Sequence, residues 1–410
     1  MNLAINGGAP VSATPLRFGW PIINESVEQA IITQLHESIS IYDDSGIFQE
    51  FETEFAAYHH MPYALLVNSG TSGLQSAYYS MMLQPGDEVI CPVYTFHATV
   101  SPMMHFGLMP TMVDCDMYGQ IDPALIEKAI TDKTKAVIVT HMWGYAVDIE
   151  KVREICNRHG LLLIEDCSHA HGATVDGRPL GSFGDISVWS LQGQKIITGG
   201  EGGMMLFKNK QHFERAVLYG HYNKRCKQQV EDDSLKAYAL TGAGLKLRAS
   251  TLNVAMARHY FNQLSTINTE KSQNAECFSR GIQLIDGIQV LESRPSSTNS
   301  WYAQNIMYDE AIVGVPRERF AAALHAEGLV EADIPGSTGP IHREPLFNEP
   351  HVVFPYLYNS SLHNKDRTFE RAESFYSRII KLPVWTATDN ATDRYIEGFN
   401  KVIANIHELQ

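Results

Sequence analysis

Between residues 62 and 207 the chain alternates short apolar runs with longer amphipathic stretches. The apolar runs, each of strand length, occupy 63–67, 88–91, 111–113, 136–140, 161–164, 186–189 and 203–207. Amphipathic stretches with helical spacing fill most of the gaps, at 71–83, 96–106, 122–130 and 148–159. Strands that are joined by helices form a mostly parallel sheet with helices on both faces. The alternation therefore predicts an α/β fold around a mostly parallel sheet of seven strands.

The sequence on either side of this region has a different character. Before it lie two helical patterns, 26–37 and 46–59, and Ser26 is a candidate N-cap. After it, residues 208–250 are polar and charged. The rest of the chain mixes short strands with helical patterns at 250–264, 270–285, 316–327, 365–381 and 391–408. We therefore predict three parts: an N-terminal arm (1–25), a large domain (26–250) and a smaller C-terminal α+β domain (251–410).

Composition argues against several classes of protein. The 410 residues carry a net charge of −14 without a basic block, whereas nucleic-acid recognition needs clustered Lys and Arg. No apolar run approaches the ~20 residues of a membrane-spanning helix, and the N-terminus lacks the pattern of a signal peptide. The six cysteines are scattered without a C-x-x-C pair, which is typical of free thiols in a reducing compartment. We therefore expect a cytoplasmic protein without membrane or nucleic-acid partners.

Ligands of an open α/β sheet bind at the carboxyl ends of its strands, so the residues after each predicted strand are candidates for a site. After 63–67 comes N-S-G-T-S-G-L (68–74), which opens a helix. The small residues there, including Gly70 and Thr71, allow the amides of the helix N-terminus to approach an anion such as phosphate. The alternative is an ordinary capped turn in which Ser or Thr is the N-cap.

Two other strand ends carry notable residues. Phe96 follows the strand 88–91 and could stack on a planar ring, although an isolated aromatic residue more often belongs to a core. Asp166 follows the strand 161–164, where a buried carboxylate needs a partner such as a protonated ring nitrogen. The alternative for Asp166 is a solvated strand end. His169 and His171 come next, but two histidines near one Asp lack a third ligand, so we expect no metal.

Lys195 lies between the strand 186–189 and a glycine cluster at 199–203. Lysines are mostly on the surface, but this position places the side chain on the ligand face of the sheet. A desolvated amine there has a lowered pKa, which Schiff-base chemistry requires. A phosphate turn, an aromatic residue, a strand-end Asp and a Lys, in that order, are the groups that bind pyridoxal phosphate. A nicotinamide cofactor is excluded because its glycine fingerprint is missing.

The sequence also resembles a known family, the DegT/DnrJ/StrS-type sugar aminotransferases, a branch of the fold-type I pyridoxal-phosphate enzymes. The resemblance covers nearly the whole chain. Its matching segments are NSGTSGL (68–74), PGDEVICPVYTFHAT (85–99), D-x-x-H-A-x-G (166–172), S-x-x-x-x-K-x-I-T-x-G-E-G-G (190–203) and G-x-K-x-R (244–248). It implies the cofactor pyridoxal 5'-phosphate (PLP) and a large domain with a seven-stranded sheet, followed by a smaller α+β domain.

The resemblance assigns roles by position. Lys195 resembles the lysine that forms a Schiff base with PLP and then moves the proton. Asp166 resembles the carboxylate that pairs with the pyridinium nitrogen. His169 lies where the family has Gln or His near the 3-oxygen of PLP, and Phe96 resembles the stacking aromatic residue. The phosphate ligands that the resemblance implies are Gly70, Thr71 and Ser190.

Lys246 departs from the commonest pattern of the family. In G-x-N-x-R the family often has an Asn that reaches the cofactor phosphate of the neighbouring subunit, and here the residue is a lysine. A lysine can bind that phosphate as a point charge, or it can reach a substrate phosphate instead. The resemblance thus implies a homodimer with shared active sites and leaves the contact of Lys246 open.

The reaction implied by the resemblance is a ping-pong transamination. Glutamate or glutamine gives its amino group to a keto sugar, nucleotide-linked or free, or to a keto-cyclitol, in the biosynthesis of a polysaccharide or a secondary metabolite. Dehydratases of the family have His at the Schiff-base position, so Lys195 favours transamination. A lyase or dehydratase, and a non-catalytic PLP-binding sensor, are the alternatives. Candidate substrate contacts are Trp143, His342 and Arg343, of which the last two lie in a loop (331–347) that is otherwise an exposed polar segment.

Overall fold

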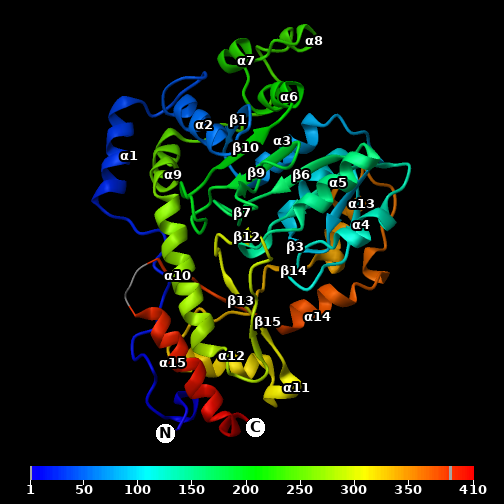
Figure 1. Cartoon of the computed structure of the whole chain (residues 1–410). Helices are drawn as coiled ribbons and strands as arrows, with labels where there is room; N and C mark the ends of the chain where they lie inside the picture. The colour runs from blue at the N-terminus through cyan, green and yellow to red at the C-terminus, as the bar shows by residue number, and fades with distance from the viewer. Residues whose placement is uncertain (1, 387–389) are drawn as a thin grey trace.

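The computed structural model describes residues 2–386 and 390–410. Its largest sheet has seven strands in the order β1-β10-β9-β6-β5-β2-β4 (Figure 1). These strands are β1 (Tyr63–Val67), β2 (Glu88–Pro92), β4 (Met109–Val113), β5 (Thr134–Thr140), β6 (Leu162–Asp166), β9 (Ile186–Ser190) and β10 (Gly203–Phe207). The predicted seven-stranded α/β sheet is therefore confirmed.

Strand β10 runs against the other strands of this sheet. β2 is parallel to β4 and β5, β5 to β6, and β6 to β9, whereas β10 is antiparallel to both β9 and β1. Gly203 pairs with Ser190 and with Val67, so β10 starts where β9 and β1 end. The loop 191–202 therefore lies at the carboxyl edge of the sheet, which is the edge where α/β folds bind ligands.

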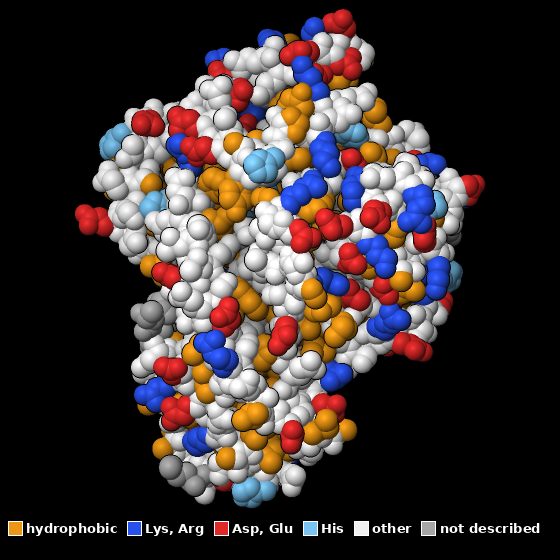
Figure 2. Space-filling model, viewed as in Figure 1, with side chains coloured by type: hydrophobic (Ala, Val, Ile, Leu, Met, Phe, Trp, Pro, Cys, Tyr) orange, Lys and Arg blue, Asp and Glu red, His pale blue; other side chains and the backbone are white. Residues whose placement is uncertain are grey.

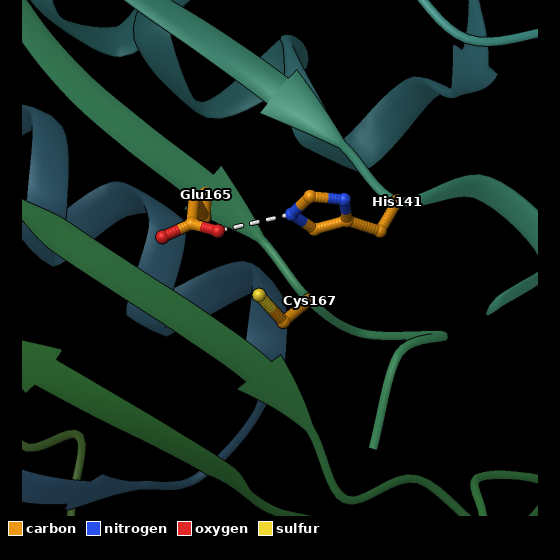
Figure 3. Close-up of side chains that lie close together, drawn as sticks. All are labelled: His141, Glu165 and Cys167. Carbon is orange, nitrogen blue, oxygen red and sulfur yellow. Dashed lines mark hydrogen bonds and ion pairs between the residues drawn. The ribbon is translucent and has the colours of Figure 1, made fainter. Parts of the chain in front are cut away.

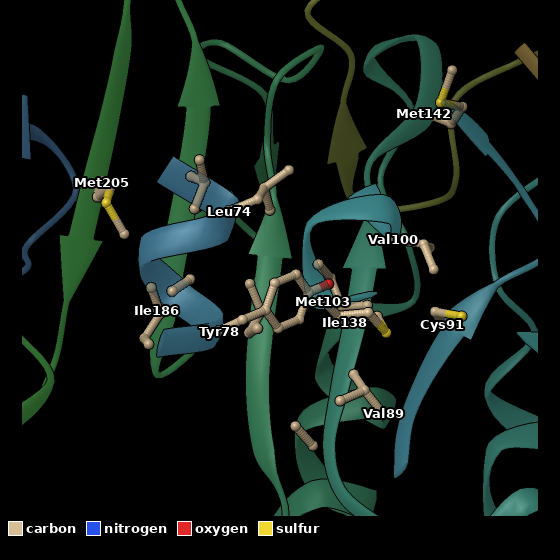
Figure 4. Packing of buried hydrophobic residues seen from close by; sticks show 14 of the residues in the cluster. Leu74, Tyr78, Val89, Cys91, Val100, Met103, Ile138, Met142, Ile186 and Met205 are labelled. Carbon is tan, nitrogen blue, oxygen red and sulfur yellow. The ribbon is translucent and has the colours of Figure 1, made fainter. Parts of the chain in front are cut away.

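Side chains alternate between the two faces of the sheet, and each face has its own apolar core. On β10, Met205 belongs to one core and Met204 to the other. Figure 4 shows the first core, where Leu74 and Tyr78 of α3 (Gly70–Ser80) lie over the sheet. Helix α6 (Lys210–Gly220) covers the same face. The helices on the other face are α2 (Gly46–Tyr58), α4 (Pro123–Ala129), α5 (Ile149–His159) and α9 (Thr251–Asn262).

Some local features differ from the sequence-based expectations. Helix α1 (Glu25–Glu37) is capped by Asn24, which accepts a hydrogen bond from the amide of Val27, and not by Ser26. Asn and Ser are equally good caps, so the sequence alone could not choose between them. The stretch 96–106 forms two 3₁₀ helices, His97–Thr99 and Ser101–Phe106, and not one amphipathic α-helix.

The polar segment 208–250 also holds more helix than its composition suggests. It contains α6, α7 (Lys224–Gln229) and α8 (Asp233–Lys236). Helix α6 buries eight of its eleven residues, among them Phe213 and Val217, which belong to the first apolar core. Its buried positions include polar residues such as His212 and Glu214, so the apolar pattern is interrupted and its helical spacing is a weak signal.

A third apolar core surrounds a small sheet with the order β11-β13-β15. Its strands are β11 (Ile288–Val290), β13 (Gln304–Tyr308) and β15 (Ile379–Leu382), and the helices packed on it are α10 (Leu264–Ile282), α12 (Arg317–Ala326) and α15 (Ala391–Ala404). Leu3 is part of this core, and its amide donates a hydrogen bond to Glu408 Oε2 at 3.0 Å. The two ends of the chain thus lie together (Figure 1).

Shorter elements complete the chain. They are the strands β3 (Tyr94–Phe96), β7 (Thr174–Val175), β8 (Arg178–Pro179), β12 (Ser297–Thr298) and β14 (Thr338–Pro340), and the helices α11 (Glu310–Val313), α13 (Pro350–Val353) and α14 (Glu370–Arg378). The division into an arm (1–25) and two domains (26–250 and 251–410) stays a prediction.

Basic and acidic side chains are mixed on the molecular face that Figure 2 shows. All six cysteines are free, and Cys277 is the one that is not fully buried. None of the helices in the described part of the chain combines the length and the hydropathy that crossing a membrane requires.

Candidate active site

A cavity of about 370 Å³ lies at the carboxyl edge of the large sheet. Its walls come from segments that follow β1, β3, β5, β6 and β9. Eight residues predicted from the sequence line it: Gly70, Thr71, Phe96, Trp143, Asp166, His169, Ser190 and Lys195. We call it the cofactor cavity. Segments far apart in the sequence bring these side chains together because the strands end at one edge.

Lys195 enters the cofactor cavity from the loop between β9 and β10. Burial lowers the pKa of its amine from 10.5 to about 8, and the charge of Asp166 opposes this shift. Its Nζ lies 4.6 Å from the centre of the Tyr302 ring. Its carbonyl accepts a hydrogen bond from the indole of Trp20 at 2.9 Å. An amine with this pKa is neutral in part of the molecules near pH 7, so it can act as a nucleophile or accept a proton.

Asp166, the last residue of β6, is only 4% exposed. Its Oδ2 accepts a hydrogen bond from Thr99 Oγ1 at 2.8 Å, and its Oδ1 accepts one from the amide of Ser168 at 3.1 Å. Thr99 is itself hydrogen-bonded to Thr95 at 2.9 Å and to Thr140 at 3.0 Å. These contacts fix the carboxylate without neutralising it. Since a carboxylate offers about four acceptor positions, Asp166 can accept a further hydrogen bond from a ligand.

The N-terminus of α3 forms another wall. Ser69 caps the helix by accepting a hydrogen bond from the amide of Ser72 at 3.0 Å. The amides of Gly70 and Thr71 belong to the first turn, where N–H groups have no partner inside the helix. A Cβ at Gly70 would lie 2.8 Å from Cβ of Ser190, so the turn approaches β9 this closely only with glycine. Helix amides beside the Ser190 hydroxyl form a suitable place for a phosphate.

Three rings stack beside Lys195. The rings of His169 and Tyr302 are 3.9 Å apart and 6° from parallel, and Trp143 lies 5.6 Å from His169. The amide of Trp143 donates to His169 Nδ1 at 3.3 Å, so the neutral ring carries its proton on Nε2. Burial, assisted by the charge of Lys195, holds the pKa of His169 well below its ordinary value. A neutral His169 therefore offers an N–H donor at the cavity.

Several cavity residues were missed from the sequence. Phe96, at the end of β3, lies opposite Thr338 of β14, and this pairing brings residues 337 and 338 to the cavity wall. Ser337 and Thr338 belong to the predicted loop 331–347, whereas the missed wall residues include Gln194, Tyr302 and Lys381. Gln194 could have been proposed as the neighbour of Lys195. The others come from the C-terminal part of the chain and lie in no recognisable motif.

All residues predicted for the site lie in the described part of the chain. Three of them do not line the cofactor cavity. Lys246 is joined to its surroundings by an isolated backbone bridge. His342 Nε2 is 3.2 Å from Glu373 Oε1, and Arg343 donates to the same oxygen at 2.7 Å. Arg343 lines a neighbouring groove of about 810 Å³. The roles of these residues at the substrate stay predictions.

A buried cluster of His141, Glu165 and Cys167 lies at the ends of β5 and β6 (Figure 3). His141 Nε2 is 3.0 Å from Glu165 Oε2, and His141 Nδ1 accepts a hydrogen bond from the amide of Val147 at 3.1 Å. Glu165 also accepts hydrogen bonds from the amides of residues 181, 183 and 184. Burial raises the pKa of the Cys167 thiol well above its ordinary value. With both ring nitrogens and the carboxylate already bound, this cluster fits a structural brace for the end of β6 better than a metal site.

Comparison with protein families gives one clear match. The model described as the DegT/DnrJ/EryC1/StrS aminotransferase family matches residues 23–399. This range includes every residue discussed above as lining the cofactor cavity.

Individual proteins of known name are similar to the chain over most of its length. The L-glutamine:2-deoxy-scyllo-inosose aminotransferase of Streptoalloteichus tenebrarius is 30% identical, over 85% of this chain and 83% of that protein. The GDP-perosamine synthase of Escherichia coli O157:H7 is 28% identical, over 80% of this chain and 86% of that protein. The X-ray structure of an aminotransferase from Psychrobacter cryohalolentis is 25% identical, has a TM-score of 0.82 and covers 95% of this chain and 100% of that one.

Proposed function

The chain belongs to the DegT/DnrJ/EryC1/StrS aminotransferase family and is a PLP-dependent aminotransferase, and from this premise we propose that it transfers the amino group of glutamate or glutamine to a keto-cyclitol or a keto sugar. The observation that carries this proposal is the meeting of Lys195 and Asp166 in one buried cavity, with a helix N-terminus at its wall. The names of the relatives support both classes of acceptor.

The residues of the cofactor cavity fit PLP. The amides of Gly70 and Thr71 and the hydroxyl of Ser190 would hold its phosphate, Asp166 its ring nitrogen, and Phe96 the face of its ring. The close approach of residue 70 to β9, which a Cβ would prevent, is the cradle that a phosphate needs. Bound PLP supplies an electron sink that stabilises negative charge on the substrate carbon.

Lys195 moves the proton in both halves of the reaction. With a pKa of about 8, about a tenth of its amine is neutral at pH 7. In that form, Nζ takes the proton from the amino-bearing carbon of the donor. The protonated amine then returns a proton to the carbonyl carbon of the acceptor. A pKa close to the working pH suits a group that acts as base and acid in turn.

Asp166 and its threonines orient the cofactor. The carboxylate accepts the N–H of the pyridine ring, and Thr99 keeps Oδ2 in position through its 2.8 Å hydrogen bond. Because this carboxylate is shielded from water, its negative charge favours the protonated ring nitrogen more strongly than an exposed one would.

We also propose that two copies of the chain complete each other's sites through Lys246. All residues that line the cofactor cavity belong to the described part of the chain, and Lys246 is not among them. Around it, Tyr222, Tyr238, Leu240 and Leu245 are large apolar side chains left exposed in the single chain. Such a patch is typical of a surface that another protein covers.

The test is the visible absorption of the purified protein with PLP, before and after addition of glutamate or glutamine. We expect a yellow protein whose colour disappears with a donor while an equivalent amount of keto acid is released. A yellow protein that responds to no amino donor would contradict the aminotransferase proposal and favour lyase or dehydratase chemistry. A protein that does not bind PLP would contradict the role of Lys195.

A further inference from the structure

A second cavity, of about 280 Å³, adjoins the cofactor cavity. The two share Gln194, Tyr302 and Lys381 in their walls. Because Phe18 and Trp20 of the predicted N-terminal arm close its other side, we call it the arm cavity. Trp20 also donates its indole N–H to the carbonyl of Lys195. The arm cavity therefore lies beside the backbone of Lys195, whose side chain lines the adjoining cofactor cavity.

The apolar part of the arm cavity consists mainly of aromatic rings. Phe18 and Trp20 are stacked, with ring centroids 6.2 Å apart and planes 9° from parallel. Tyr302 faces the same space, and burial raises the pKa of its hydroxyl to about 12, so the hydroxyl stays neutral. The face of Tyr302 stacks on His169, so these side chains form an apolar wall rather than a set of free ring faces. Such a wall suits the C–H groups of a six-membered ring, which exclude water on contact.

The polar part offers both donors and acceptors of hydrogen bonds. Lys381 Nζ lies 3.4 Å from Asp333 Oδ2, and the two residues also pair through their backbones. Glu331 uses one oxygen to accept the amide of Phe18 at 3.0 Å. A hydroxyl group both donates and accepts, so a pair of an ammonium and a carboxylate can bind neighbouring hydroxyls of one ring.

Size and charge argue against a nucleotide in this space. Cavities for drug-sized ligands measure ~300–1,000 Å³, and this one is slightly smaller. The charged wall residues that one chain supplies are two carboxylates, Glu331 and Asp333, and one ammonium, Lys381. A diphosphate needs an excess of positive charge, whereas a neutral polyol does not.

We propose that the arm cavity is the subsite for the ring of a neutral, polyhydroxylated acceptor, a keto-cyclitol or a keto sugar without a nucleotide. Asp333 and Lys381 bind hydroxyls of this ring, while its C–H groups contact the apolar wall of Phe18, Trp20 and Tyr302. The carbonyl carbon then points toward Lys195. This inference rests on the proposed function and narrows its acceptor from two classes to one.

The first test measures binding without reaction. myo-Inositol is a neutral cyclitol without a keto group, and its affinity for the PLP-loaded protein can be measured by saturation-transfer NMR. We expect Asp333→Asn and Lys381→Met each to weaken binding about tenfold, since each removes a hydrogen bond to a charged group. Asp286→Asn is the matched control, because this exposed carboxylate lines neither cavity, and it should bind as the wild type does. Equal binding by all four proteins would overturn the proposal.

The second test separates the acceptor from the donor in steady-state assays, with the keto-cyclitol 2-deoxy-scyllo-inosose as acceptor and glutamine as donor. Asp333→Asn and Lys381→Met should raise KM for the keto-cyclitol by the same factor and leave KM for glutamine unchanged. A rise in KM for glutamine alone would show that Lys381 binds the donor carboxylate and would overturn the proposal. A lower KM for a GDP-linked keto sugar than for the keto-cyclitol would also overturn it. Failure of the proposed function has a different signature, because then the yellow colour responds to no donor while inositol binding can still be measured.

Discussion

Replacing Lys195 with methionine removes an ionisable group from the cofactor cavity and keeps a side chain of similar length. In the protein without PLP, burial lowers the pKa of this amine from 10.5 to about 8. The unfolded chain therefore holds more protons than the folded one between those two values. Stability rises with pH wherever the unfolded state binds more protons, so the wild type should become more stable as the pH rises above about 8.

The size of this effect follows from the two pKa values. The full difference corresponds to about 3.4 kcal/mol. Between about pH 7 and about pH 9.5, where the folded amine titrates and the unfolded one hardly does, the free energy of unfolding should rise by about 2 kcal/mol through this group. Lys195→Met should lack this rise and should also lack turnover, since it removes the amine that binds PLP and moves the proton.

The assay is urea unfolding of the PLP-free wild type and of Lys195→Met at both pH values, with Lys133→Met as the control. Lys133 is exposed, so its replacement should keep the rise seen in the wild type. Other groups also titrate in this range, such as Lys271, whose pKa is lowered by burial to about 7. Comparing the variants at each pH cancels the contribution of these groups to the free energy of unfolding. Parallel pH profiles for the wild type and Lys195→Met would refute the inference that the cavity desolvates this amine.

Three further predictions concern the neighbours of Lys195. Asp166→Asn should still bind PLP but lower kcat about 100-fold, because the ring nitrogen loses its charged partner; a near-native kcat in steady-state assays would contradict this role. Gly70→Ala should weaken PLP binding and cost about 1–3 kcal/mol of stability, since its Cβ would meet Ser190 at 2.8 Å; equilibrium titration with PLP and thermal unfolding measure both effects. Glu165→Gln should cost about 3 kcal/mol, because a buried charge is lost from four hydrogen-bond donors; the cost should shrink at acidic pH, since burial raises the pKa of Glu165 but its partners outweigh burial and hold it below 4.5.

The large sheet could be predicted because its signal is local. Each strand of the sheet is a short apolar run between turn residues, and the helices between them repeat at helical spacing. Helix α6 was missed because it buries polar residues such as His212 and Glu214 beside Phe213 and Val217, which interrupts the apolar pattern. The choice of Asn24 over Ser26 as the cap of α1 depends on the path of the preceding chain, which local sequence does not encode.

The residues of the candidate site also fall into two groups, those with a local sequence signal and those without one. Residues that follow a strand of the large sheet, such as Asp166 and Lys195, could be placed together because parallel strands end at one edge. Tyr302 and Lys381 reach the site from the C-terminal part of the chain through tertiary packing. No periodicity or motif announces such a contact, so these residues could not be found from the sequence.

The N-terminal segment has a practical consequence for producing the protein. The amide of Leu3 is hydrogen-bonded to Glu408, that of Ala4 to Glu327, and the indole of Trp20 to the carbonyl of Lys195. A purification tag or fusion partner at the first residue would pull on a segment that ends beside the reactive lysine. A tag at the C-terminus begins at the same contact, because Glu408 binds the amide of Leu3. A tag at either end should therefore be removed by proteolysis before kinetic work.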